Sequence, residues 1–207
     1  QDITPIRSTD ALVNAISTTT SSNVITITDT NHGAIQGDFV TLSSVSTAVA
    51  GIPAATLDAE YQILSIANSD AYTIQSSATA NANTGPTANC TINYQLNIGP
   101  SVQTFGFGWG AGSWNAGTWN TPRTTSQITL DARLWSINNW GEDLIITQKD
   151  GGTYEWDTSS GMTDNRATVV ANAPTTSTLS LVSTETRHVV CMGTETTIGT
   201  NTTQDKM

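Results

Sequence analysis

Residues 133–157 read RLWSINNWGEDLIITQKDGGTYEWD, and this stretch predicts three short antiparallel strands joined by turns. The run at 134–137 is rich in apolar residues and ends in two asparagines. The run at 143–147 is rich in β-branched residues and too short for a stable helix. Residues 152–156 return as the third strand, with two aromatic residues on one face. We therefore expect an antiparallel sheet unit of the kind repeated in β-propellers.

The turn before the third strand carries its own signal, Lys-Asp-Gly-Gly at 149–152. Asp before Gly suits the positive-φ positions of a tight hairpin. Asp150, Gly151 and Gly152 are therefore predicted to be structural turn residues rather than chemical ones.

The composition of the chain limits the classes of function that it can have. The chain has 207 residues, a net charge of −10 and only seven Lys plus Arg, which cannot form the basic surface that nucleic-acid binding needs. No apolar run approaches the ~18 residues of a membrane span. The abundance of Thr, Ser, Asn and Gly favours an all-β protein with many turns. The chain opens on Gln1, and we expect it to be part of a longer protein.

The region at 17–97 predicts a separate small β-barrel or sandwich. It contains several short runs of strand-forming residues, separated by turn clusters and without a long helix, at 24–28, 38–42, 59–66, 71–75 and 90–96. We predict that this module is inserted into a second domain formed by residues 1–16 and 98–207. That second domain is expected to be propeller-like and incomplete.

A segment rich in Trp and Gly lies between the two regions. Trp109, Trp114 and Trp119 are five residues apart, a spacing that matches neither a strand nor a helix. Exposed indoles can stack on sugar rings or serve as interface anchors, and they can also pack over their own domain. We favour packing or subunit contact, with a glycan contact as the alternative.

No set of residues predicts an enzyme, a metal site or a cofactor. Glu142 and Asp143 are adjacent and point to opposite faces of a strand, so they do not form the carboxylate pair of a glycosidase. We interpret this pair, and likewise Glu155 and Asp157, as solvated ends of hairpins. His32 and His188, like the two cysteines discussed below, have no partners at ligand spacing in the sequence.

The two cysteines, Cys90 and Cys191, are far apart in the sequence. We expect two free, buried thiols rather than a disulfide.

Six stretches together resemble a family of tail proteins from tailed bacteriophages. They are DITPIR at 2–7, HGAIQGDFV at 32–40, GWGAGSW at 108–114, LWSINNWGEDLI at 134–145, DGGTYEWD at 150–157 and RHVVCMG at 187–193. The stretches follow the family's order along nearly the whole chain. They are structural rather than chemical motifs, and thus specify architecture better than activity.

The resemblance implies a structural virion protein, part of the tail nozzle or hub around the DNA exit channel. Members are longer proteins with propeller-like sheets and a small inserted β-barrel. Expected partners are further copies of the chain in a ring, neighbouring tail proteins and DNA that passes without specific binding. The expected location is the virion, after assembly in the host cytoplasm.

One alternative remains open, a carbohydrate-binding or sialidase-like β-propeller that recognises a glycan on the host surface. The turn at 150–154 resembles the Asp-box of sialidase-like propellers, S-x-D-x-G-x-T-W, but it lacks the Ser and has its Thr one residue early. An Asp-box stabilises a fold and is not a catalytic site, so this likeness supports a propeller alone.

Overall fold

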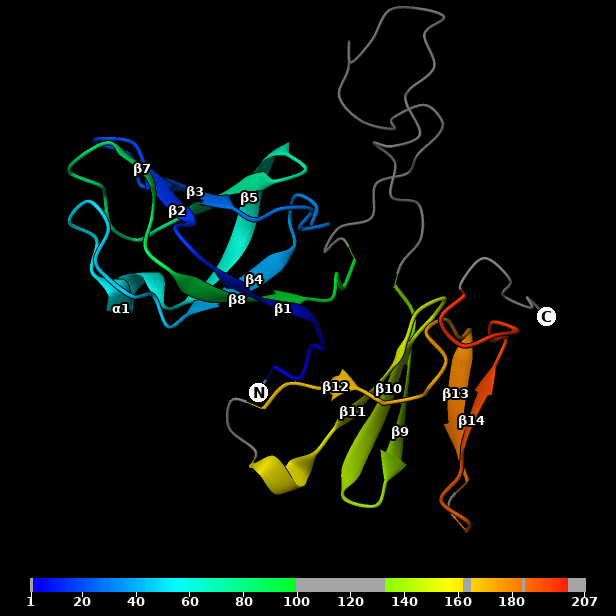
Figure 1. The fold of residues 1–207 in the computed structure, drawn as a ribbon. Helices are drawn as coiled ribbons and strands as arrows, with labels where there is room; N and C mark the ends of the chain where they lie inside the picture. Colours follow the sequence, from blue (N-terminus) through cyan, green and yellow to red (C-terminus); the bar gives the residue numbers. More distant parts are fainter. Residues whose placement is uncertain (1, 100–132, 162–164, 184, 201–207) are drawn as a thin grey trace, which may run out of the picture. The chain divides into compact units, whose positions relative to one another are not determined.

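A computed structural model describes residues 2–99, 133–161, 165–183 and 185–200. The chain forms two compact units (Figure 1). The first comprises Gln1–Asn97 and Trp156–Val169, and the second comprises Ile98–Glu155 and Val170–Met207. All the sheets are antiparallel, and the fold is all-β, as predicted.

An eight-stranded sheet makes up most of the first unit, in the order β1-β8-β4-β5-β6-β3-β2-β7 (Figure 1). One short helix, α1 (Ala54–Leu57), precedes β5. The strands are β1 (Ile6–Leu12), β2 (Ile16–Thr18), β3 (Val24–Thr28), β4 (Phe39–Ser43), β5 (Glu60–Asn68), β6 (Ala71–Gln75), β7 (Thr84–Thr87) and β8 (Cys90–Gln95).

Strand β5 joins the two halves of this sheet. Residues 60–62 pair with β4, whereas residues 63–68 pair with β6. The register shifts between Ile63 and Ser65, where an additional residue interrupts the ladder. Such a bulge bends a strand and increases its twist. The bend allows the two halves to pack on each other as in a sandwich. The end strands β1 and β7 do not pair with each other, so the described sheet is not a closed barrel.

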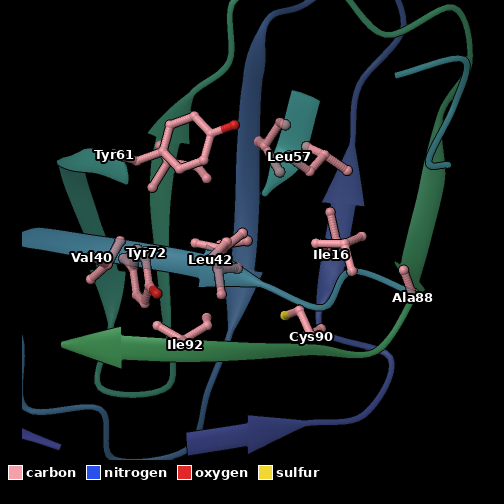
Figure 2. Close-up of a cluster of buried hydrophobic side chains, with 14 of the residues drawn as sticks. Ile16, Val40, Leu42, Leu57, Tyr61, Tyr72, Ala88, Cys90 and Ile92 are labelled. Carbon is pink, nitrogen blue, oxygen red and sulfur yellow. The ribbon is translucent and has the colours of Figure 1, made fainter. Parts of the chain in front are cut away.

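The core lies between these halves and is built by strict alternation. In β3, β4, β6 and β8 every second side chain is buried, as expected for strands with one face inward. Figure 2 shows Leu42 and Ile92 in the same interior as Ile16 from β2 and Leu57 from α1. Burying such a side chain fully contributes about 1.5–3 kcal/mol, so this cluster is the main source of stability in the unit.

A polar cluster is enclosed in the same core. The Tyr94 hydroxyl donates to Asp29 Oδ2 at 2.5 Å and lies 3.2 Å from the Tyr72 hydroxyl. Burial, followed by the nearby Tyr72 and Asp29, raises the pKa of Tyr94, which keeps its proton available for this bond. The ring of His32 meets Tyr72 edge-on at 5.0 Å, and the Arg7 guanidinium lies over the Tyr94 ring. Each group therefore has a partner, which keeps the cost of burying it low.

The segment from Trp156 to Val169 belongs to the first unit through Arg166. This guanidinium contacts Asp2 at 2.5 Å and Glu60 at 2.7 Å. The adjacent Ala167 is fully buried, and its carbonyl accepts a hydrogen bond from the backbone of Ile6 at 3.2 Å. A side chain and the backbone thus fix the same short segment.

The remaining described strands form a four-stranded sheet, in the order β12-β11-β10-β9, and a two-stranded sheet (Figure 1). Strand β12 lies in the segment assigned to the first unit, and the two-stranded sheet belongs to the second. The four-stranded sheet contains β9 (Trp135–Trp140), β10 (Asp143–Gln148), β11 (Thr153–Trp156) and the short β12 (Thr168–Val169). A single 3₁₀ turn, η2 (Thr158–Ser160), follows β11. The second sheet pairs β13 (Leu179–Val182) with β14 (Val189–Met192).

Most predicted strands are confirmed, including all five in the region 24–96 and the three in the opening stretch. The structure differs in where the first unit begins. Strand β1 pairs with β8, from Ile6 opposite Gln95 to Leu12 opposite Cys90. The predicted boundary between residues 16 and 17 therefore does not coincide with the edge of the compact unit. The insertion of the module into a larger domain stays a prediction.

Replacing Tyr94 with Phe is expected to destabilise the first unit by about 1.5–3 kcal/mol, because the buried Asp29 carboxylate loses its hydroxyl donor. Tyr72→Phe is the matched control, since its hydroxyl contacts Tyr94 and is not bonded to Asp29. It should cost only about 0.5–1.5 kcal/mol. The free energy of unfolding from urea denaturation measures both. Equal losses would show that the carboxylate does not depend on Tyr94.

Candidate functional site: an apolar hairpin face over a hydroxyl-lined interior

The two faces of the β13–β14 hairpin differ in composition. Residues opposite each other across the hairpin share a face, and the faces alternate along each strand. One face carries the pairs Ser180–Cys191 and Val182–Val189, and the other carries Leu181–Val190 and Leu179–Met192. The first face is therefore mixed, and the second is apolar.

The side of the hairpin that carries Ser180 packs on β9 and β10 through hydroxyl groups. Thr147 Oγ1 lies 2.8 Å from Ser180 Oγ and 3.1 Å from Thr153 Oγ1, within hydrogen-bond distance of both, and these two threonines and Ser180 are at most 1% exposed. Ser136 Oγ accepts from the Ser180 backbone at 3.0 Å. Asn138 Nδ2 donates to the Ser180 carbonyl at 3.0 Å. Because hydrogen bonds are directional, this interior fixes the register of the hairpin on the sheet.

The other side of the hairpin is apolar and open. Leu181 is 48% exposed, Val190 46% and Leu179 36%, and Met192 is partly buried beside them. We call these four residues the hairpin face. An apolar cluster with a polar rim is typical of a surface that another protein layer covers. Strand β14 therefore has an exposed outer side.

Two loops next to the hairpin are held together by one carboxylate. Glu195 is 5% exposed, and its Oε1 accepts from the backbone of Thr175 at 2.8 Å and of Gly199 at 2.7 Å. The Thr175 hydroxyl also donates to it. Burial alone would raise the pKa of Glu195, but these donors outweigh it and hold the pKa below its ordinary value of 4.5. The carboxylate of Glu195 therefore links the two loops, and both of its oxygens accept hydrogen bonds from them.

The predicted turn residues lie in the connection between β10 and β11. Asp150 has a left-handed backbone, with φ of 58°, whereas Gly151 does not. Gly151 forms a bridge with Ser177, and the Asp150 backbone donates to the Ser177 carbonyl at 2.8 Å. The connection therefore anchors the loop that leads into β13. The sequence did not indicate this second contact.

The other candidates from the sequence do not assemble into a reactive site in the described part of the chain. Trp109, Trp114 and Trp119 lie outside the described residues. Asp157 accepts a hydrogen bond from the Ser159 backbone at 2.7 Å and caps the 3₁₀ turn. His32 is buried, with Nδ1 bonded to the Ala34 backbone at 3.0 Å and Nε2 at 3.2 Å from the Asn68 carbonyl. His188 is exposed.

The cysteines and acids also remain apart. Cys90 is buried and Cys191 is partly buried, and both thiols are free. Burial raises the pKa of the Cys90 thiol to about 11, with smaller effects from Asp29 and Asp58, so it stays an unreactive thiol near neutral pH. Within the described ranges, no three His, Cys, Asp or Glu residues come close enough to hold a metal ion. The same ranges contain no helix with the length and apolarity needed to cross a membrane.

Replacing Glu195 with Gln is expected to lower the melting temperature at pH 7, because the neutral amide accepts the N–H bonds of Thr175 and Gly199 more weakly. The folded pKa is lowered, so the carboxylate stabilises the fold above pH 4.5 and this contribution is lost as the pH falls below that value. The two melting temperatures should therefore converge in acid. A difference that stays constant from pH 7 to acid would contradict this role.

Comparisons with known proteins give limited information. No family model matches the chain, and no curated protein matches it. Among solved structures, the phage phi92 endosialidase is similar over 79% of this chain, with 12% sequence identity and a TM-score of 0.37. The chain spans about a quarter of that protein's length, since 24% of it is covered.

Proposed function

We propose that the chain is a structural, non-enzymatic protein of a tailed-bacteriophage virion, part of the tail nozzle or hub around the DNA exit channel. The six sequence stretches that resemble tail proteins of this kind support the class of protein. The hairpin face is the observation that carries the assembly role, because four apolar side chains are presented together on one side of a short, rigid hairpin. Further copies of the chain and neighbouring tail proteins are the proposed partners.

The proposed mechanism is mechanical. The hydroxyl-lined interior holds β13 and β14 against β9 and β10, which keeps the hairpin face in a fixed orientation on its own sheet. A rigid face loses little conformational freedom when it binds, and this favours ordered assembly. In this proposal, the module at 17–97 is an insertion in a propeller-like domain formed by residues 1–16 and 98–207.

The charge of the chain fits a channel through which DNA slides. With a net charge of −10, the surface repels phosphates and provides no phosphate-neutralising stripe. In this proposal the acidic surface prevents the passing DNA from binding to the wall of the channel.

Replacing Leu181 with Lys is expected to weaken self-association, because it puts a charge in the middle of the hairpin face. Sedimentation velocity of the wild-type chain at increasing concentration should show oligomers, and the variant should shift toward the monomer. Ile198→Lys is the matched control, since Ile198 is 56% exposed and lies outside the hairpin. Identical sedimentation of wild type and Leu181→Lys would remove the hairpin face as the interface.

The chain is expected to release no products from peptidoglycan, measured as new reducing ends. The physical reason is that most glycosidases use two carboxylates that flank the glycosidic bond. Asp157 is instead engaged with the Ser159 backbone. Turnover that disappears in Glu155→Gln or Asp157→Asn would overturn the non-enzymatic proposal.

A further inference from the structure

A groove of about 400 Å³ lies on the outer side of the first unit, where β5 passes from β4 to β6. It lies beside the bulge in β5, because Leu64, one of its lining residues, falls within the register shift between Ile63 and Ser65. A cavity of this size is in the range of small-ligand sites, which is about 300–1,000 Å³.

The side chains around the groove are mostly carboxamides. Gln36, Gln62 and Gln75 come from a loop, from β5 and from β6, and all three are exposed. Gln62 Nε2 donates weakly to the Gly37 carbonyl at 3.2 Å. In the described part of the chain, the side chains of Gln36 and Gln75 make no hydrogen bond. A carboxamide both donates and accepts, as a sugar hydroxyl does, so three of them can pair with neighbouring hydroxyls.

The groove has one carboxylate, Glu60, which shares the Arg166 guanidinium with Asp2. Glu60 Oε2 contacts Arg166 at 2.7 Å and accepts from Gln95 Nε2 at 2.5 Å. Both contacts use the same oxygen, so Glu60 Oε1 remains as an acceptor. No cation lines the groove, which disfavours anionic ligands such as sialic acid. Leu64, 43% exposed, offers an apolar contact for the C–H face of a sugar ring.

The lining favours a saccharide over an extended peptide. Its amides come from a loop, from β5 and from β6, so they do not form a row along one strand edge, which is what an added peptide strand would use. We propose that this groove is a binding site for a neutral saccharide, held by the amides of Gln36, Gln62 and Gln75 and by Glu60. The proposal stands on the first unit alone and does not depend on the assembly role of the hairpin face.

Titration of the full ¹⁵N-labelled chain tests it, with maltotriose and cellotriose as neutral probes and the α2,8-linked trimer of sialic acid as the anionic one. At least one neutral trisaccharide should shift the side-chain amide resonances of Gln62 and Gln75, and the anionic trimer should not. Gln62→Leu and Gln75→Leu should each weaken binding by about three- to tenfold, the effect of one lost hydrogen bond.

Thr20→Leu is the control, because Thr20 is exposed and outside the groove, and it should bind as wild type does. Unchanged spectra elsewhere in each variant confirm that the fold is intact. The proposal is overturned if neither neutral trisaccharide shifts these amides, if both Gln→Leu variants bind as wild type does, or if the anionic trimer binds equally well. Shifts caused only by a neutral peptide, acetyl-Ala-Ser-Thr-Gly-amide, would overturn it in favour of a peptide site.

Discussion

The first unit depends on the continuity of β5 through two pairings. Residues 60–62 hold β4 and residues 63–68 hold β6, so one strand carries the hydrogen bonds of both halves of the sheet. The bulge between Ile63 and Ser65 lets this strand bend without losing the ladder on either side. The two halves meet in the core, where Tyr72 of β6 contacts Tyr94 of β8. The groove lined by Gln62 and Gln75 lies beside the same bulge.

The interiors of the two units differ in composition. The first buries a large apolar cluster and encloses one satisfied polar group, Asp29 with Tyr94. The second has few buried apolar side chains, chiefly Ile145, Ile146 and Tyr154, and connects its layers through hydroxyls. Leu179, Leu181 and Val190 lie on the outer side of the hairpin. This distribution supports the hairpin face as an assembly surface.

Sequence patterns predicted the elements better than their partners. The runs at 24–28 and 71–75 alternate strictly and contain β-branched residues, which is a local signal. Strand β7 was missed because Gly85 and Pro86 have low strand propensity, and only an edge position tolerates them. The pairing of β1 with β8 connects residues more than 75 positions apart, as Leu12 with Cys90 shows, so no local pattern contains it.

Contacts between distant residues limit the prediction of sites in the same way. The turn at 150–152 has a local signal in Asp-Gly, but its bridge to Ser177 is not local. The groove combines a bulge, a loop and a neighbouring strand, and no local pattern indicates that they meet. The near-continuous apolar run of β14 is typical of a strand covered on both sides. It does not indicate that one side of Val190 is uncovered.

The hydroxyl-lined interior also affects how stability varies with temperature. Exposing apolar surface raises the heat capacity of unfolding, whereas exposing polar surface lowers it. Thr147, Thr153 and Ser180 replace apolar contacts at the centre of the second unit, so its unfolding has a small heat-capacity change for its size. Its stability curve is consequently flatter than that of the first unit. Cooling weakens the apolar core of the first unit more than the hydrogen-bonded layers of the second.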